Sequence, residues 1–289
     1  MSRSQLAVPP LLPIQYETIV RVGLAEDLGR AGDLTTDALI PGGHLSSASL
    51  VARAAGRICG LDIALAAFLM LDPSIEIERQ AADGDDVAAG AVLATVHGKT
   101  RALLAGERVA LNLLGRLCGI ATATQDLVRR VAGSKARVAC TRKTTPGLRV
   151  LEKYAVRIGG GSNHRFGLDD AILIKDNHLV ASASVTAAVE RARAAAGHWV
   201  HVELEVDSLV QLAEGLAAGV DAVLLDNMSL DELREAVGMC RDRATTEASG
   251  GITPETIGAV AATGVDLISV GWLTHSAPAH DVGLDFHPA

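Results

Sequence analysis

A regular alternation of short apolar segments and longer segments with helical spacing begins near residue 137, and it constrains the fold more than any other feature. The predicted strands lie at residues 138–141, 172–175, 200–206, 222–226, 244–247 and 267–270. Helices are expected between them, at residues 148–157, 185–196, 209–217, 230–240 and 254–262. Repeated β–α units of this kind form parallel sheets with right-handed crossovers.

Six strands are too few for a regular eight-stranded barrel. We therefore predict an irregular, incomplete α/β barrel in this half of the chain, with an open doubly wound sheet as the alternative. Earlier in the chain, residues 17–28 and 61–71 have helical spacing, and residues 46–53 are expected to form a strand. Short strands are expected between residues 75 and 96. A long helical stretch at residues 106–131 is expected to begin the second domain.

The charge of the chain is unevenly distributed. The 289 residues carry a formal net charge of -8, but residues 137–175 contain eight basic and three acidic side chains, a local balance of +5. The acidic remainder argues against general binding to nucleic-acid phosphates, and an aromatic content of 2% argues against base stacking. A basic segment in an acidic chain indicates a site for a small anion, or else a solvated helix face.

Cysteine usage and hydropathy bear on the compartment. Cys59, Cys118, Cys140 and Cys240 are far apart and form no Cys-x-x-Cys pair, so we expect neither disulfides nor structural zinc, and a cytoplasmic location. The apolar runs are too short to span a bilayer. Neither a P-loop motif nor a dinucleotide-binding glycine motif follows a predicted strand.

Polar and glycine residues follow nearly every predicted strand. The carboxyl ends of parallel strands meet at one edge of a sheet, where the chemistry of α/β folds is concentrated. The residues at these ends are Arg142, Lys143, Lys175, Glu205, Asp226, Ser249, Gly250, Gly251 and Gly271. Such a combination of cations, carboxylates and glycines predicts one anion-binding site at this edge rather than six unrelated loops.

These polar residues fall into two chemical groups. The cations among them, together with His164 and Arg165, can bind carboxylates or phosphates through charge-assisted hydrogen bonds. Glu205 and Asp226 can face Mg²⁺ through a diphosphate, or stabilise positive charge on a sugar.

A Ser-Gly-Gly segment at residues 249–251 precedes a helix with Thr253 at its amino end. Free N–H groups and a positive helix end would make it a phosphate nest, although a glycine pair alone is more often a simple turn. By contrast, His198 and His201 lie at a strand start and are expected to face solvent rather than to bind a metal.

Several motifs together resemble one family. Thr-Arg-Lys-Thr-Thr-Pro-Gly at 141–147, Asn-His-Arg at 163–165 and Lys-Asp-Asn-His at 175–178 are similar to those of nicotinate-nucleotide pyrophosphorylase, also called quinolinate phosphoribosyltransferase. Gly-Glu-Arg at 106–108, Leu-Asp-Asn at 225–227 and Ser-Val-Gly at 269–271 follow the same pattern. The resemblance runs from residue 17 to residue 286.

The resemblance implies two domains and a decarboxylating phosphoribosyl transfer. An N-terminal α/β sandwich would cover residues 1–117, with residues 278–289 packing back onto it, and an irregular α/β barrel would cover residues 118–277. In de novo NAD biosynthesis, the family uses Mg²⁺ to convert quinolinate and phosphoribosyl pyrophosphate to nicotinate mononucleotide, pyrophosphate and CO₂. It is built on a homodimer in which the partner subunit completes each active site, and a higher oligomer is also compatible with it.

The resemblance also assigns residues to substrates. Those implied to surround the quinolinate carboxylates and neighbouring phosphates are Thr141, Arg142, Lys143, His164, Arg165 and Lys175. Those implied to hold the 5′-phosphate are Ser249, Gly250, Gly251, Val270, Gly271 and Trp272. Glu205 and Asp226 would face the ribose and, indirectly through pyrophosphate, the metal, while Arg108 would act from the other subunit. The predicted catalytic set is Lys143, Lys175, Glu205 and Asp226.

One residue departs from the family pattern, because Trp272 stands where a small residue, Ala, is usual. A large indole could narrow the pocket or reposition the phosphate loop. The other cations of the basic segment are expected on helix surfaces or in structural roles, namely Arg137, Arg149, Lys153 and Arg157. A non-catalytic or molybdate-transport-associated paralog is the alternative function, and the intact Asn-His-Arg and Lys-Asp-Asn-His motifs argue against it.

Overall fold

The computed structural model describes residues 8–288, and the chain divides into two compact units. The first unit holds the described chain up to Gln125, the segment Thr144–Gly160, and the described residues from Ser276 onward. The second unit holds Asp126–Lys143 and Gly161–His275. The sequence placed a boundary after residue 117, a position that lies inside one unbroken helix. Residues 1–7 and Ala289, which the predicted domains include, lie outside the described residues.

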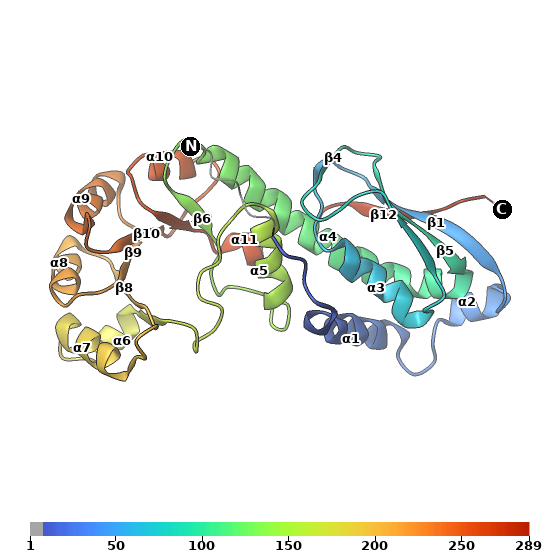
Figure 1. Cartoon of the computed structure of the whole chain (residues 1–289), viewed down its shortest axis with the longest axis horizontal. Coiled ribbons are helices and arrows are strands. Elements are labelled where there is room, and N and C mark those ends of the chain that lie inside the picture. Colours follow the sequence, from blue (N-terminus) through green and yellow to red (C-terminus); the bar gives the residue numbers. More distant parts are fainter. Residues whose placement is uncertain (1–7, 289) are drawn as a thin grey trace. The chain divides into compact units, whose positions relative to one another are not determined.

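The first unit is built on an antiparallel sheet of four strands in the order β12-β1-β5-β3 (Figure 1). The strands of this sheet are β1 (Leu45–Ala52), β3 (Glu76–Arg79), β5 (Val92–Lys99) and β12 (Val282–Phe286). A separate two-stranded pair consists of β2 (Gly56–Arg57) and β4 (Asp86–Val87). Because β12 pairs along β1 from Ala48 to Ala52, the C-terminal segment is an integral edge of this sheet.

Five α-helices and one 3₁₀ turn of the described chain accompany this sheet. They are η1 (Pro13–Gln15), α1 (Glu17–Leu28), α2 (Leu34–Leu39), α3 (Leu61–Leu71), α4 (Thr100–Arg130) and α5 (Arg149–Ile158). Helix α4 begins earlier than the predicted residue 106. Gly106 lies in its interior, where a Cβ would come within 2.8 Å of Phe68 on α3. The glycine therefore marks close packing and not a helix start.

The C-terminal segment from Ser276 onward, called the tail below, crosses α4 on a face of small residues. At Gly119 an added Cβ would come within 2.0 Å of the Pro278 carbonyl oxygen, and at Gly115 within 2.7 Å of the His280 carbonyl oxygen. The His280 amide donates to the Gly115 carbonyl at 2.8 Å. Side chains at these two positions would lift the tail from the helix, so the glycines allow the backbones to approach.

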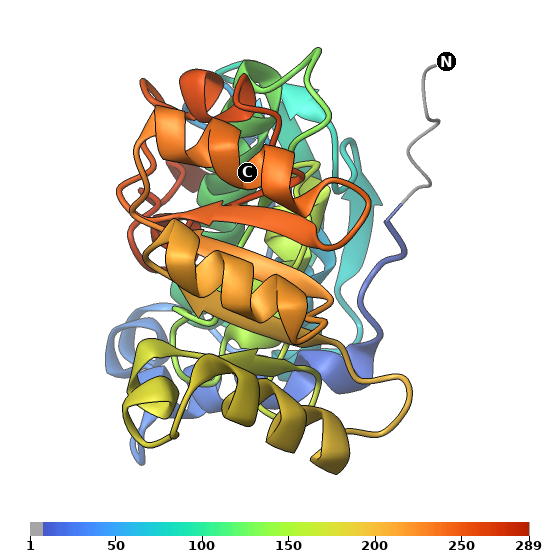
Figure 2. The ribbon, with the colours of Figure 1, turned by 90° about the vertical axis from the view of Figure 1, so that its left-hand side faces the viewer.

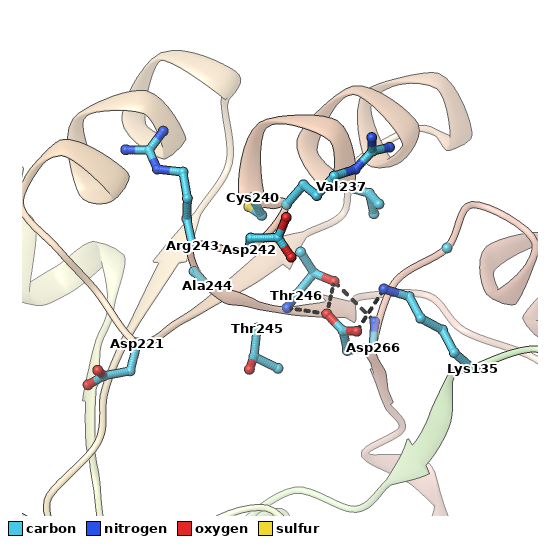
Figure 3. A pocket seen from close by; sticks show the side chains of 12 residues that line it. Lys135, Asp221, Val237, Cys240, Asp242, Arg243, Ala244, Thr245, Thr246 and Asp266 are labelled. Carbon is cyan, nitrogen blue, oxygen red and sulfur yellow. Dashed lines mark hydrogen bonds and ion pairs between the residues drawn. The ribbon is translucent and has the colours of Figure 1, made fainter.

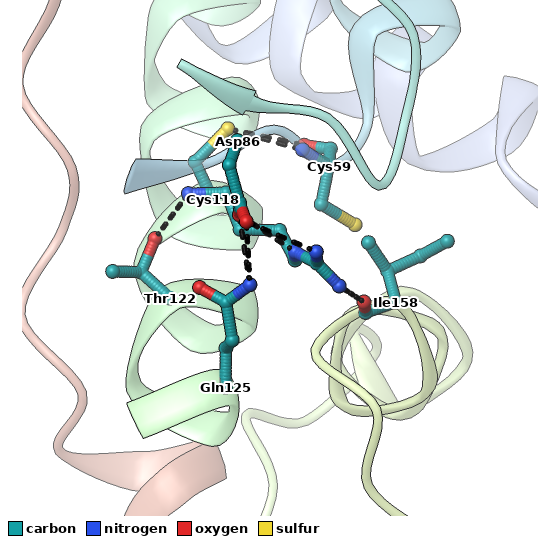
Figure 4. Close-up of polar contacts among 7 residues, drawn as sticks. Cys59, Asp86, Cys118, Thr122, Gln125 and Ile158 are labelled. Carbon is teal, nitrogen blue, oxygen red and sulfur yellow. Dashed lines mark hydrogen bonds and ion pairs between the residues drawn. The ribbon is translucent and has the colours of Figure 1, made fainter. Parts of the chain in front are cut away.

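A polar cluster connects β2, β4, α4 and the end of α5 within the first unit (Figure 4). The Arg57 guanidinium donates to both carboxylate oxygens of Asp86, at 3.0 and 3.4 Å, and to the Ile158 carbonyl at 3.1 Å. Gln125 also donates to Asp86, at 2.8 and 3.0 Å. These bonds explain why the end of α5, far along the chain, belongs to this unit. Nearby, burial raises the pKa of the Cys118 thiol to about 12, which excludes it as a nucleophile.

The second unit contains one all-parallel sheet of six strands in the order β6-β11-β10-β9-β8-β7. The strands are β6 (Arg137–Ala139), β7 (Ile172–Ile174), β8 (Val202–Val206), β9 (Ala222–Asp226), β10 (Thr245–Ser249) and β11 (Leu267–Ser269). Each strand from β8 to β11 lies beside its predecessor in the chain, and β11 pairs with β6. This order is that of a barrel that lacks the β6–β7 pair, and it has none of the order reversal of a doubly wound sheet. The predicted fold class is confirmed.

Helices alternate with these strands, and the three longest of those helices lie along one side of the sheet (Figures 1 and 2). The alternating helices are α6 (Asp176–Val180), α7 (Val185–Ala195), α8 (Leu209–Ala217), α9 (Leu230–Cys240), α10 (Ile257–Ala261) and α11 (Trp272–His275). The side chains of Ser184, Ser208 and Ser229 cap α7, α8 and α9. No described helix is both long and apolar enough to cross a membrane.

Candidate functional site

A cavity of about 790 Å³ lies at the carboxyl ends of the parallel strands, and every residue that lines it belongs to the second unit. Fourteen of the fifteen predicted site residues line this cavity. The fifteenth, Arg108, is an exposed residue of α4 in the first unit. The structure thus brings together residues from seven segments that are up to 131 positions apart in the chain, between Thr141 and Trp272.

Sequence reasoning missed a deeper layer of the same cavity. This layer consists of Leu173, Leu224, Glu247 and Ser269. Each lies on a strand, two positions before a predicted site residue at or just after the end of that strand, so its side chain is expected on the same face one step further down. The sequence did offer one signal for this layer, a charged glutamate inside an otherwise buried strand. It occurs at Glu247 and at Glu203.

The cations of the cavity are only partly neutralised. Lys175 forms an ion pair with Glu205, and the Arg165 guanidinium donates to the Ala171 carbonyl at 2.8 Å. The buried Nε atoms of Arg142 and Arg165 have no hydrogen-bond partner among residues 8–288. Burial lowers the pKa of Arg165, and the like charge of Arg142 lowers it further. Two partly buried guanidiniums with unmet donors make this a site for an anion.

The predicted phosphate nest has strained backbone geometry. Gly250 and Gly251 have φ values of +97° and +59°, and a Cβ at Gly250 would come within 2.2 Å of Asn227 Oδ1. Asn227 itself has a φ of 53°, and its amide donates to the Ser249 carbonyl at 2.9 Å. On the adjacent strand end, a Cβ at Gly271 would come within 2.9 Å of the Lys143 side chain. Only glycine permits these close approaches.

The indole of Trp272 is fixed to the same segment of chain. Its Nε1–H donates to the Ile252 carbonyl at 3.0 Å, and both residues line the cavity. The large side chain therefore joins the 249–252 loop to the start of α11. In this arrangement the departure from the family's small residue adds a contact between the two loops.

A Trp272→Phe variant is expected to raise the KM for phosphoribosyl pyrophosphate by about 3- to 10-fold, because it loses one partly buried hydrogen bond of ordinary strength. The kcat is expected to stay within about twofold, since no charged group changes. Steady-state kinetics provide the measurement, with Trp199→Phe as the control, because Trp199 is 86% exposed. Unchanged KM in Trp272→Phe would show that the indole does not hold the loop.

At the floor of the cavity, His164, Glu203 and Glu247 form a cluster. One polar side-chain atom from each residue lies within 4.8 Å of those of the other two. His164 Nδ1 accepts the Arg165 amide proton at 2.7 Å, and Nε2 lies 2.9 Å from Glu203 Oε2. Because Nδ1 is an acceptor, the ring proton is on Nε2 and is donated to Glu203. His164 is thereby a neutral residue that positions Arg165, and not a further cation for substrate.

Glu247 has a different environment from Glu203. Its side chain is 2% exposed, and Oε1 lies 3.6 Å from His164 Nε2, beyond hydrogen-bond distance. The pKa of Glu247 is raised to about 7, first by burial and then by the charge of Glu203, with His164 and Ser269 acting in the opposite direction. Oε1 has no hydrogen-bond partner among the described residues.

A second cavity of about 630 Å³ lies at the amino ends of β9, β10 and β11 (Figure 3). Three of its charged groups, Lys135, Asp221 and Asp266, form ion pairs within the fold. Lys135 contacts Asp266 at 2.8 Å, and Asp266 accepts from the hydroxyl and the amide of Thr246 at 2.7 and 3.0 Å. Residues at this end of a β/α fold usually serve stability, so we assign this cavity no ligand.

The fold and the first cavity define an α/β-barrel protein with a site for polyanionic small molecules. The chain belongs to the quinolinate phosphoribosyltransferase family. The model of the family's N-terminal domain matches residues 33–118, and that of its C-terminal domain matches residues 120–285. The predicted family is confirmed.

Similar proteins cover nearly the whole chain. The probable nicotinate-nucleotide pyrophosphorylase (carboxylating) of Bacillus subtilis is 45% identical over 272 residues, which is 94% of this chain and 93% of that protein. The Mycobacterium leprae nicotinate-nucleotide pyrophosphorylase (carboxylating) is 45% identical over 274 residues, 92% of this chain and 95% of that protein. The crystal structure of NadC from Streptococcus pyogenes superposes with a TM-score of 0.92 at 40% identity, over 97% of this chain and 100% of that one.

Proposed function

We propose that this chain is a decarboxylating quinolinate phosphoribosyltransferase. It converts quinolinate and phosphoribosyl pyrophosphate to nicotinate mononucleotide, pyrophosphate and CO₂, a step of NAD biosynthesis. The observation that carries the proposal is the joint placement of four cations and two carboxylates around one cavity at the strand ends. The family to which the chain belongs, and the names of its relatives, support the same reaction.

The charge of the cavity suits the proposed substrates. Quinolinate is a dianion, and phosphoribosyl pyrophosphate carries more negative charge still. Arg142 and Arg165 present guanidinium groups suited to planar carboxylates, and Lys143 lies over Gly271 beside the loops proposed to hold the 5′-phosphate. A pocket that concentrates positive charge in an acidic chain therefore binds both substrates at one place.

Glu205 and Asp226 are proposed to face the ribose. Loss of pyrophosphate leaves positive charge on the sugar, and these carboxylates at the ends of β8 and β9 can stabilise it. Asp226 accepts from the Asn227 side chain at 2.9 Å, which fixes its orientation. Glu205 also forms an ion pair with Lys175, a second residue that lines the cavity.

Mg²⁺ is the proposed cofactor. Carboxylate oxygens and substrate phosphates are the ligands that this ion prefers, and Glu205 and Asp226 both line the cavity, so the donor set fits. These residues would hold the ion indirectly, through the pyrophosphate group. When bound, Mg²⁺ neutralises charge that develops on the leaving pyrophosphate.

We further propose that the protein acts as a homodimer, in which Arg108 serves the active site of the partner subunit. Arg108 is exposed, and none of the other predicted site residues lies in its unit, which is compatible with such a role. A cytoplasmic location is proposed from the four cysteines, all of which are free thiols in the structure.

Purified protein with Mg²⁺, quinolinate and phosphoribosyl pyrophosphate is expected to release CO₂ and form nicotinate mononucleotide. Labelled CO₂ from quinolinate and chromatography of the nucleotide are the measurements. Nicotinate should not replace quinolinate, because it lacks one of the two carboxylates that the cation set would bind. Turnover of nicotinate without turnover of quinolinate would overturn the proposal, and binding of both substrates without product would favour the non-catalytic paralog.

A further inference from the structure

Decarboxylation leaves a chemical requirement that the residues assigned so far do not meet. When the 2-carboxylate of the phosphoribosylated substrate leaves as CO₂, the electron pair of the broken bond stays on ring carbon C2. This carbanion is stabilised by the adjacent cationic ring nitrogen, but it must still gain one proton to become nicotinate mononucleotide. A proton donor at the floor of the cavity would supply it.

Four buried polar atoms of this cavity have no hydrogen-bond partner among residues 8–288. They belong to Arg142, Arg165, Glu247 and Ser269. Unpartnered polar atoms are rare inside folded proteins, and four around one cavity indicate that a ligand completes them. Two are guanidinium nitrogens, which suit the carboxylates of the substrate. A carboxyl oxygen beside the same ligand is repelled by those carboxylates unless it carries a proton.

The surroundings of Glu247 keep its proton in place. Glu203 and Glu247 share one buried cluster with His164, whose Nε2 is within hydrogen-bond distance of Glu203 but not of Glu247. Glu203 accepts the His164 proton, and its charge raises the pKa of Arg165, so Glu203 has partners that Glu247 lacks. Glu247 is paired in register with Leu224, and its Oε1 has no hydrogen-bond partner among the described residues. The remaining proton therefore belongs on Glu247.

We propose that Glu247 is the proton donor of the decarboxylation step. The C2–carboxylate bond breaks and CO₂ leaves, the electron pair remains on C2, and the Glu247 carboxyl proton forms the new C2–H bond. Glu247 becomes a carboxylate and regains its proton from water after the product leaves. The inference rests on the proposed function, because it assumes quinolinate as the substrate.

The pH profile of the wild-type enzyme tests this role without any substitution. Because the pKa of Glu247 is about 7, the donor is protonated below that pH and is lost above it. In single-turnover reactions, CO₂ release is expected to slow above about pH 7, while pyrophosphate release does not follow the same curve. A CO₂ step that is flat from pH 6 to pH 9 would overturn the proposal.

A Glu247→Gln variant separates the two chemical steps. The amide has nearly the same shape but no proton of suitable acidity. With quinolinate labelled in its 2-carboxylate, pyrophosphate release is expected within about tenfold of wild type. Release of CO₂ should be slower by ~100-fold or more, so that the dicarboxylated mononucleotide accumulates. Equal slowing of both steps, or no effect on either, would contradict the proposal.

Two further variants serve as controls. Ser269→Ala changes the other unpartnered oxygen of the same layer, and it is expected to raise the KM for quinolinate without separating the two steps. Glu247→Asp keeps the acid on a shorter side chain and is expected to recover part of the CO₂ step lost in Glu247→Gln. If Glu247→Gln fails to fold, the Glu247→Asp variant provides the test instead. Absence of pyrophosphate release from quinolinate in wild-type protein would instead reject the proposed function itself.

Discussion

An Arg165→Ala variant is expected to lose ~100-fold or more in kcat/KM for quinolinate while keeping its thermal stability. Each hydrogen bond to a charged group contributes about 1.5 to 3 kcal/mol, and a guanidinium can offer a carboxylate two of them. In the free protein the same group is under repulsion, because burial and the charge of Arg142 both lower its pKa. Removing it relieves that repulsion and offsets the loss of the bond to the Ala171 carbonyl.

Kinetics and thermal unfolding together provide the measurement for Arg165→Ala. Arg165→Lys keeps the charge but not the planar pair of donors, so an intermediate activity is expected. Lys135→Ala is the matched control, because Lys135 is a cation of the second cavity that is already paired with Asp266. Its kcat/KM is expected within about twofold of wild type. A full-activity Arg165→Ala enzyme would remove this residue from the quinolinate site.

Local sequence signals predicted several elements to the residue. The bounds of α8 and α9 match the prediction because a serine caps each helix and apolar residues recur at helical spacing. The region after Thr253 was predicted as a helix from residue 254, whereas regular helix begins only at Ile257. A tight turn held by Thr253 and Thr256 hydrogen bonds precedes it, and such a turn looks like a helix start in sequence.

Most of the outer layer of the site was predictable because its residues lie at or just after the ends of predicted strands, whereas His164 and Arg165 were assigned from the family resemblance. The deeper layer was not, since a glutamate within a strand can face either the interior or a helix, and only the assembled barrel decides which. Lys153 shows the same limit. We expected it among the helix-surface or structural charges, yet it is 1% exposed on α5. Its neighbour Glu152 is also buried and accepts from Arg116 at 2.8 Å, a partner 36 residues earlier. Partners so distant in sequence leave no local pattern.

Mixed subunits are expected to regain activity if Arg108 acts in the active site of the partner. An Arg108→Ala chain and a Lys175→Ala chain should each be nearly inactive alone. After exchange, half of the dimers pair one chain of each kind, and such a dimer has one intact site and one site with both defects. The mixture is therefore expected to reach about one quarter of wild-type activity.

A second mixture distinguishes this arrangement from its alternative. Lys143 and Lys175 line the same cavity of one chain, so Lys143→Ala mixed with Lys175→Ala leaves no intact site and should stay inactive. If Arg108 instead serves the cavity of its own chain, the Arg108→Ala and Lys175→Ala mixture also has no intact site. Inactivity of both mixtures, with subunit exchange demonstrated by mass labelling, would therefore assign Arg108 to its own subunit. Recovery in the first mixture alone requires two chains for one active site.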